Sequence, residues 1–362
     1  MSEQTKIEWA DKTWNCWEGC EPCSAGCKNC YAKERAKRFK TDFVGSRIVR
    51  TEAYWKEPLK WNKAADELRI DPVFFNEPRP RVFPSLCDPF EDWSGGMVDH
   101  KGRQLFTISG AEWFTEAVYP ECRPLTMADV RARLFRLIDA TPHLDWLLLT
   151  KRPENVLRWK GEESFWPARS SHLVCNELES GITTTADFVE RKNVWLGTSC
   201  ENQETADKRI PELLKCRDLS PVLWLSCEPL LGPIDLRSIN CRFNEGGSTD
   251  VNVLREGIDW VVAGGESGPN ARPCSIDWLR SLRDQCSAAG VPYFLKQLGS
   301  VPTIRESTAT DYRNATHAEM EWADGTLFQG NRVLLSDRKG GDPAEWPVDL
   351  RDCRAFPEAV KC

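Results

Sequence analysis

The chain has 362 residues, of which 41% are hydrophobic and 28% charged, as in a globular protein with one large domain or two ordinary ones. Its net charge of −7 excludes a protein that coats nucleic acid non-specifically, because such binding needs a surplus of Lys and Arg. A local basic run at 33–40 is interpreted as a solvated helix face, with a phosphate-binding groove as the alternative.

The N-terminal residues lack the apolar segment of a signal peptide, and no apolar run reaches membrane-spanning length. We therefore expect a cytoplasmic protein without membrane association, in which thiols stay reduced. Sixteen cysteines in that setting do not predict a disulfide framework. Those that are scattered singly are interpreted as small buried hydrophobic residues.

The first third of the chain is mixed. A short strand is predicted at 5–9, then a cysteine-rich loop and a helix from about 29 to 40. A helical patch at 54–68 and a strand at 81–86 precede a long polar insertion at 89–123. The spacing of Val130, Leu134 and Ile138 predicts a helix over 126–140.

A regular alternation of strands and helices follows. Strands are predicted at 145–150, 193–199, 221–226, 259–264 and 291–296, as apolar runs typical of strands buried on both faces. Helices are predicted at 153–159, 202–216 and 275–289, the last with Ser275 as N-cap and Gly290 just beyond its end. Two further insertions are predicted at 160–190 and 237–256.

Six or seven buried strands separated by helices predict an α/β protein with a parallel sheet covered by helices. We expect a parallel (β/α) barrel, partial rather than closed, over residues 1–299. A doubly wound sheet is the weaker choice, because no Gly-x-Gly-x-x-Gly follows an early strand. The polar residues 300–362 are expected to form a C-terminal appendage packed on the barrel.

Five cysteines are concentrated in one stretch, at Cys16, Cys20, Cys23, Cys27 and Cys30. The spacing Cys-x3-Cys-x2-Cys occurs twice, ending at Cys23 and at Cys30, and it matches enzymes that use S-adenosylmethionine (SAM) with an iron–sulfur cluster. Cys20-x6-Cys27-x2-Cys30 is a wider variant. Three thiolates suit a 4Fe-4S cluster, because the fourth iron stays open to bind SAM.

Structural zinc is the alternative, since four thiolates close a tetrahedral site and the loop offers five. Zinc ribbons, however, usually bring two Cys-x2-Cys knuckles separated by a longer segment. Here the cysteines fall within 15 residues and lead into a helix, whose N-terminus stabilises an anionic cluster. The motif therefore favours a cluster over zinc.

Polar residues follow the predicted strands at the edge where a barrel carries its functional groups. They are Asp88, Lys151, Arg152, Glu201, Glu228, Lys296 and the segment Gly264-Gly265-Glu266-Ser267. For any one position a solvated loop is an adequate explanation. Their repetition over six strands predicts a shared mouth, where the glycines let a ligand approach the backbone.

Further motifs occur in order along most of the chain: Thr5-Lys6-Ile7-Glu8-Trp9, Gly26-Cys27-x-Asn29-Cys30-Tyr31, Leu149-Thr150-Lys151-Arg152-Pro153, Ser226-x-Glu228-Pro229-Leu230, Gly264-Gly265-Glu266-Ser267-Gly268 and Phe294-x-Lys296-Gln297. With them the chain resembles a phage and prophage protein family of unknown function that carries a three-cysteine motif and is related to radical SAM enzymes. The resemblance implies a radical SAM-like TIM barrel. It places the three cluster ligands on Cys20, Cys27 and Cys30, with Cys23 as an alternative ligand.

On this interpretation, Asn29, Tyr31 and residues 264–267 contact SAM, and Glu266 takes its amino group. Asp88, Lys151, Arg152, Glu201, Glu228 and Lys296 are expected to contact substrate or ribose. An electron donor reduces the cluster, SAM is cleaved to methionine and a 5′-deoxyadenosyl radical, and the radical abstracts a hydrogen atom from substrate. The expected substrate is a small molecule or nucleotide, including a base of nucleic acid for modification or repair. The alternative function is a non-catalytic binding protein with structural zinc.

Overall fold

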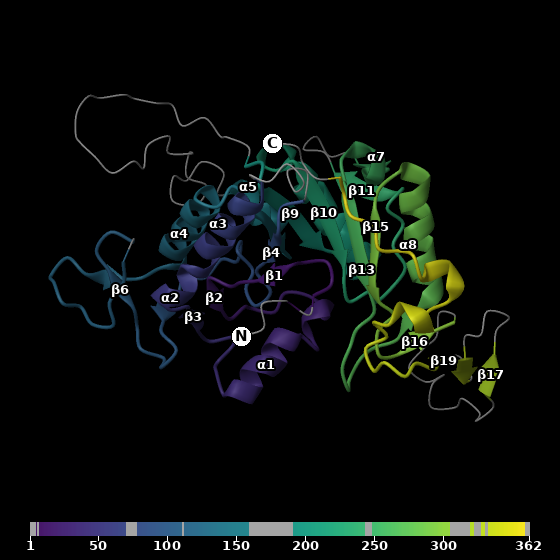
Figure 1. Ribbon diagram of the computed structural model, residues 1–362, viewed down its shortest axis with the longest axis horizontal. Helices are drawn as coiled ribbons and strands as arrows, with labels where there is room; N and C mark the ends of the chain where they lie inside the picture. Colours follow the sequence, from purple (N-terminus) through teal and green to yellow (C-terminus); the bar gives the residue numbers. More distant parts are fainter. Residues whose placement is uncertain are drawn as a thin grey trace.

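The computed structural model describes residues 5, 7–69, 78–110, 112–158, 191–242, 248–304, 319–321, 327–329 and 332–358. Seven strands form one parallel sheet that curls into a half-barrel (Figure 1). In spatial order they are β1 (Lys12–Thr13), β4 (Arg81–Phe83), β8 (Asp145–Thr150), β9 (Val194–Ser199), β10 (Val222–Cys227), β13 (Trp260–Gly264) and β15 (Tyr293–Gln297). The predicted parallel α/β sheet is confirmed in this form.

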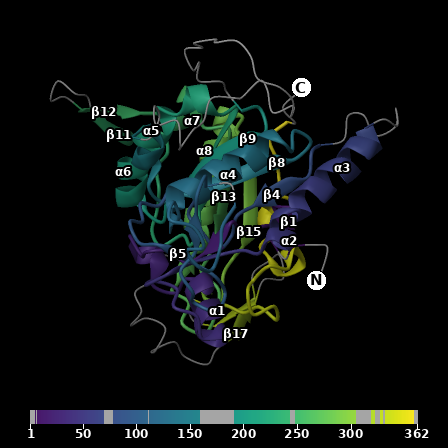
Figure 2. The same cartoon turned by 90° about the vertical axis from the view of Figure 1, so that its left-hand side faces the viewer.

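The spatial order of the strands is their order along the chain, so each crossover places the next strand beside the last. The crossovers carry α3 (Glu57–Arg69), α4 (Met127–Asp139), α5 (Pro153–Arg158), α6 (Gln203–Leu214) and α8 (Ile276–Ala289), which lie on the outer side of the sheet (Figure 2). Capping boxes at Thr126 and Asn202 begin α4 and α6. Ser275 caps α8, and Gly290 ends it in the left-handed conformation, as predicted.

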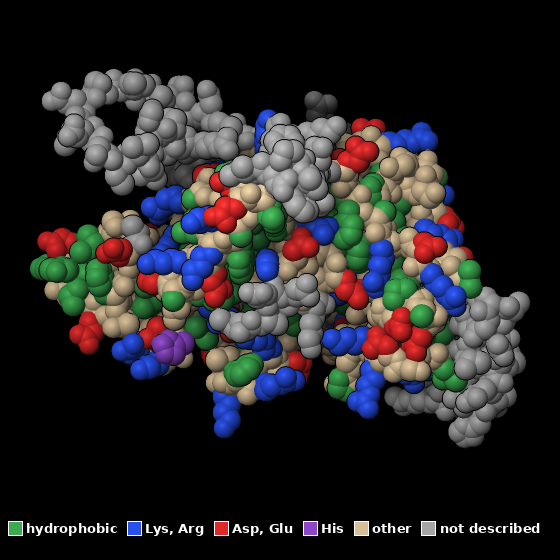
Figure 3. All heavy atoms as spheres, viewed as in Figure 1, with side chains coloured by type: hydrophobic (Ala, Val, Ile, Leu, Met, Phe, Trp, Pro, Cys, Tyr) green, Lys and Arg blue, Asp and Glu red, His purple; other side chains and the backbone are tan. Residues whose placement is uncertain are grey.

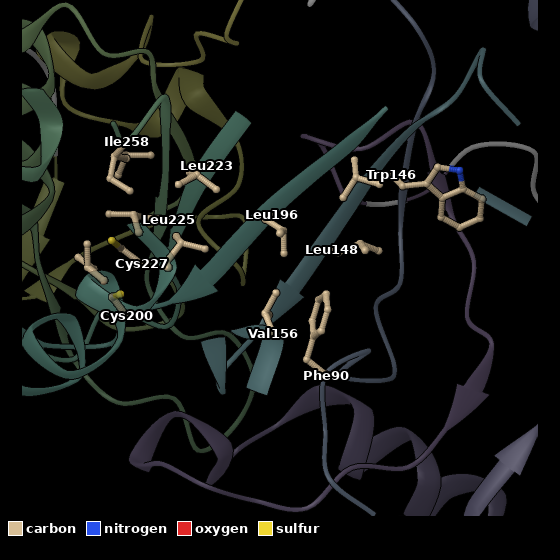
Figure 4. Packing of buried hydrophobic residues seen from close by; sticks show 14 of the residues in the cluster. Phe90, Trp146, Leu148, Val156, Leu196, Cys200, Leu223, Leu225, Cys227 and Ile258 are labelled. Atoms are coloured by element: carbon tan, nitrogen blue, oxygen red, sulfur yellow. The ribbon is translucent and has the colours of Figure 1, made fainter. Parts of the chain in front are cut away.

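The central strands are buried on both faces, and alternate residues enter two separate cores. Residues such as Trp146, Leu148 and Leu225 pack outward against the helices (Figure 4). On the concave side, Trp195, Trp224, Trp260 and Phe294 pack with Trp9. Aromatic rings therefore fill the inside of the half-barrel, where four of the sixteen tryptophans lie.

The predicted strand at 5–9 is wrong, because Glu8 and Trp9 form a turn and the first strand is β1. Trp9 is only 2% exposed, and its ring centroid lies 4.5 Å from Phe83 and 5.2 Å from Trp224. Burial of this ring inside the half-barrel outweighs the local preference for an extended strand.

The insertions carry small sheets of their own. The insertion at 89–123 contains β5 (Met97–Val98), β6 (Phe106–Thr107) and β7 (Arg123–Pro124), and β5 joins β2 (Trp17–Glu18) and β3 (Arg47–Val49) in one sheet. The insertion at 237–256 forms the β11–β12 hairpin (Ile239–Arg242 and Ser248–Val251) and α7 (Val253–Glu256). The predicted insertion at 160–190 lies outside the described residues. The helical patch expected at 54–68 is α2 (Glu52–Trp55) followed by α3.

The described part of residues 300–358 packs against the half-barrel. β16 (Pro302–Thr303), β17 (Glu319–Glu321), β18 (Leu327–Gln329) and β19 (Arg332–Val333) form a sheet with β14 (Cys274–Ser275). Beyond it Trp346 is fully buried, and the Trp260 indole donates a 2.9 Å hydrogen bond to the carbonyl of Ala355. Within the described ranges, no helix combines the length and apolar character needed to span a bilayer.

Candidate functional site

A cavity of about 270 Å³ opens at the carboxyl edge of the parallel sheet. Trp9, Phe83 and Leu149 provide its apolar lining from inside the half-barrel. Across from these residues, the segment 19–30, which we call the cysteine loop, contributes a second wall. Its cavity-lining thiols are Cys20, Cys23, Cys27 and Cys30.

The backbone of the cysteine loop is tightly constrained. Gly19 has φ +117°, and a Cβ there would lie 2.3 Å from the carbonyl oxygen of Ser46. A single 3-10 turn, η1 (Ala25–Cys27), precedes α1 (Tyr31–Phe39), and Cys30 is the N-cap residue of α1. The prediction that Cys30 begins a helix is confirmed.

The loop thiols differ in ionisation. A hydrogen bond from the Cys23 thiol, together with the nearby ammonium of Lys151, lowers the pKa of Cys27 to about 4. Burial, assisted by the charges of Glu91 and Asp88, raises the pKa of Cys20. Cys16 is separate from this group, since it is fully buried in the outer core and its Sγ lies 3.8 Å from Cys87 Sγ.

Glu201 anchors the middle of the cysteine loop. Its carboxylate is fully buried, accepts a 2.8 Å hydrogen bond from Ser24 Oγ and is ion-paired with Lys151 and, at 2.8 Å, with Arg209. Burial raises the pKa of Glu201, but the two cations outweigh it and hold the pKa below its usual value. A Cβ on Gly26 would lie 2.3 Å from Glu201 Oε1, so any larger residue would force this carboxylate to move.

Glu266 anchors the end of the loop that leads into α1. Arg272 donates to both of its oxygens, at 2.9 Å from Nε and 2.6 Å from Nη2, and Asn29 Nδ2 donates at 2.9 Å. Arg272 also reaches the carbonyl of Ala25, at 2.9 Å. Both oxygens of Glu266 are therefore occupied by groups that join the strand-end loop to the cysteine loop.

Asp88 and Arg152 anchor the beginning of the loop. Arg152 Nη2 donates a 2.8 Å hydrogen bond to the carbonyl of Glu21, and Arg152 Nη1 lies 3.3 Å from Asp88 Oδ2. Asp88 also accepts from Thr150 Oγ1 at 3.0 Å and from the Lys151 amide at 3.2 Å. The carboxylates of Glu201, Glu266 and Asp88 thus hold the cysteine loop over the sheet, Asp88 through Arg152.

Glu228 and Lys296 face the cavity on its other side. Lys296 Nζ lies 3.1 Å from Glu228 Oε1, and both residues line the cavity. The close approaches at Gly264 and Gly265 are to the chain itself, since Cβ atoms there would lie 2.8 Å from Glu228 Oε1 and 2.1 Å from the Leu298 carbonyl oxygen. These two glycines are explained by internal packing rather than by room for a ligand.

Every residue named from the sequence as a candidate lies at this edge of the sheet. Glu201 and Gly264 are the ones that do not line the cavity directly. Sequence reasoning missed Ser24, Arg209 and Arg272. Arg209 occupies a buried position on α6 beside Ile210, and a charged residue at an apolar position of the helical pattern is the signal that could have identified it.

The donor chemistry of the cysteine loop fits a thiolate-ligated metal group, because four thiols line one cavity and the local charges favour the thiolate of Cys27. Among the described residues, no group of three or more His, Cys, Asp or Glu side chains is already arranged to hold a metal ion. All fourteen described cysteines are unpaired thiols.

The fold and site define an α/β half-barrel protein with a cysteine loop at the carboxyl edge of its parallel sheet. Residues 4–331 match the model of a family described as protein of unknown function (DUF5131), and the chain belongs to that family. No curated protein and no solved structure matches the chain.

Proposed function

We propose that this protein is a radical SAM-type enzyme whose cysteine loop holds a 4Fe-4S cluster. The observation that carries the proposal is the placement of Cys20, Cys23, Cys27 and Cys30 on one cavity at the carboxyl edge of a parallel half-barrel. What supports it is this shared cavity and the thiol chemistry, rather than a preformed ligand geometry.

In the proposed enzyme, Cys20, Cys27 and Cys30 hold the cluster, and Cys23 is the alternative ligand. A cluster held there would supply the electron that cleaves SAM reductively to methionine and a 5′-deoxyadenosyl radical. The chain positions the loop through Glu201, Glu266 and Asp88, and their buried contacts limit its movement.

The chain also shapes the space for the reactants. Tyr31, Gly265 and Ser267 line the cavity beside the thiols, where we place SAM. Trp9 and Phe83 exclude water from the side of the cavity that faces the inside of the half-barrel. Glu228 can accept a hydrogen bond from substrate, and Lys296 can donate one. We place the protein in the cytoplasm, where an electron donor is available.

The test is anaerobic reconstitution with iron and sulfide, followed by iron analysis, a visible absorption spectrum and an assay for 5′-deoxyadenosine. We expect the wild type to gain a visible thiolate-to-iron absorption band and Cys27→Ala to lose it. Cys241→Ala, which removes a thiol on the distant β11 hairpin, is the matched control and should retain the band. A wild-type protein that takes up zinc but no iron would refute the enzyme and favour the structural-zinc binding protein.

A further inference from the structure

A surplus of unpaired positive charge lies on helix α1 and just beyond its two ends, beside the cavity. Within the described chain, Lys28, Lys33, Arg38 and Lys40 have no acidic partner, whereas Lys37 pairs with Glu34. Lys28, Arg38 and Lys40 are exposed. The Lys and Arg side chains around α1 are seen at the bottom of the space-filling view (Figure 3). The chain as a whole has a net charge of −7, so this basic surface is a local feature.

Two large aromatic rings are exposed on the same helix. Tyr31 is 56% exposed and Phe39 62% exposed, although burial would be the ordinary outcome for such rings. Tyr31, Arg35 and Arg38 are spaced i, i+4 and i+7 and therefore share one face of α1, and Phe39 follows at its end. The guanidinium of Arg35 lies 5.1 Å from the Phe39 ring centroid. Arg35 is ion-paired with Glu18 at 2.6 Å, so among the described residues Arg38 is the free cation of this face, between two rings that lie about 12 Å apart along the helix, at 1.5 Å per residue.

This face leads into the cavity. Tyr31 lines the cavity, and so does the ring of Trp9, which is 2% exposed. The rings of Trp9 and Phe83 on the cavity wall suit a flat group such as a nucleobase.

We propose that the Tyr31–Lys40 face binds a single-stranded nucleic acid, with rings stacking on bases, cations neutralising phosphates and one base entering the cavity. Exposed rings between cations are what single-strand binding requires. An acidic protein partner would need only the charge, so the exposed rings favour nucleic acid. The inference rests on the proposed function for what is then done to the base.

The test measures binding of a fluorescein-labelled oligo-dT of about 12 nucleotides, a length within the site sizes of single-strand binders, by fluorescence anisotropy. The perturbed protein is the full-length double variant Arg38→Glu/Lys40→Glu. The matched control is Lys208→Glu/Arg255→Glu, which makes the same charge change on α6 and α7, at exposed unpaired positions away from α1 (Figure 2).

We expect the α1 variant to bind at least about 10-fold more weakly and its log–log salt dependence to fall by about 1.4, or 0.7 for each phosphate that is no longer neutralised. The control should stay within about threefold of wild type. Phe39→Ala should weaken binding about 5-fold or more without changing the salt dependence, because it removes only stacking. Phe39 is largely exposed, so this variant tests the proposal even if the charge variant folds poorly.

Equal weakening by the two charge variants would overturn the proposal, since net charge alone would then explain binding. Wild-type affinity in Phe39→Ala would refute stacking, and binding of polyglutamate but not of the oligonucleotide would replace it with an acidic protein partner. Binding is measured before and after iron–sulfur reconstitution. Oligonucleotide binding by a chain that takes up no iron would refute the proposed enzyme but would still support binding of single-stranded nucleic acid.

Discussion

Replacing Gly26 by alanine should loosen the cysteine loop through its contact with Glu201. The added methyl carbon would lie 2.3 Å from Glu201 Oε1, whereas ordinary contact begins at 3.4 Å, so about 1 Å of movement is needed. Glu201 cannot yield freely, because Lys151 and Arg209 hold its buried carboxylate. Weakening two charge-assisted bonds costs about 2–4 kcal/mol, and alanine returns about 0.4–1 kcal/mol by restricting the unfolded chain.

We therefore expect Gly26→Ala to lower the free energy of unfolding by about 1–4 kcal/mol in urea titrations and to reduce iron uptake on reconstitution. The control is Gly232→Ala, where the new methyl would meet only Asn202 Cβ at 3.4 Å and the stability should stay the same or rise slightly. If the two alanine variants unfold at the same urea concentration, the anchoring role of Glu201 is refuted.

Two further predictions concern the C-terminal segment. Hydrogen bonds from Arg280 and Arg283 lower the pKa of Asp349 from 3.8 to about 2, so its stabilising effect is complete above pH 4 and is lost as the pH falls through about 2. Because Asp349 is partly exposed, Asp349→Asn should cost only about 1 kcal/mol at pH 7, and urea titrations of the two proteins should converge toward pH 2. A constant difference across that range would contradict the ion-pair explanation. Trp346→Ala, at a fully buried ring, should cost about 3–5 kcal/mol in the same titration, whereas Val348→Ala, at a 52% exposed position, should cost less than about 0.5 kcal/mol. Comparable losses would mean that Trp346 does not support the fold.

The strands were predictable because each is a continuous apolar run bounded by polar residues. Residues 145–150 and 222–227 are buried along almost their whole length, as a sheet covered on both faces requires. The location of the candidate site could be predicted from the same pattern, because the carboxyl ends of parallel strands lie at the same edge of the sheet. For that reason Lys151, Glu228 and Lys296 could be placed at one mouth from the order of the strands alone.

The pairing of charges at that mouth was not predictable. Sequence reasoning assigned Glu201 and Glu266 to ligands, whereas the structure engages them with Arg209, Arg272 and the cysteine loop. These contacts join segments as far apart as residues 29 and 266, and no local pattern encodes such a meeting. Trp9 shows the same limit, because its turn is set by rings contributed by distant strands.

Residues 354 and 356, late in the chain, contact residues of the N-terminal segment and of the central sheet. Arg354 donates a 3.0 Å hydrogen bond to Glu8, the residue before Trp9, and the Phe356 ring packs 5.6 Å from Trp260. Because Trp260 belongs to the aromatic core inside the half-barrel, that core cannot be covered completely until residue 356 has left the ribosome. The C-terminal segment therefore finishes the folding of a core whose strands are synthesised well before it.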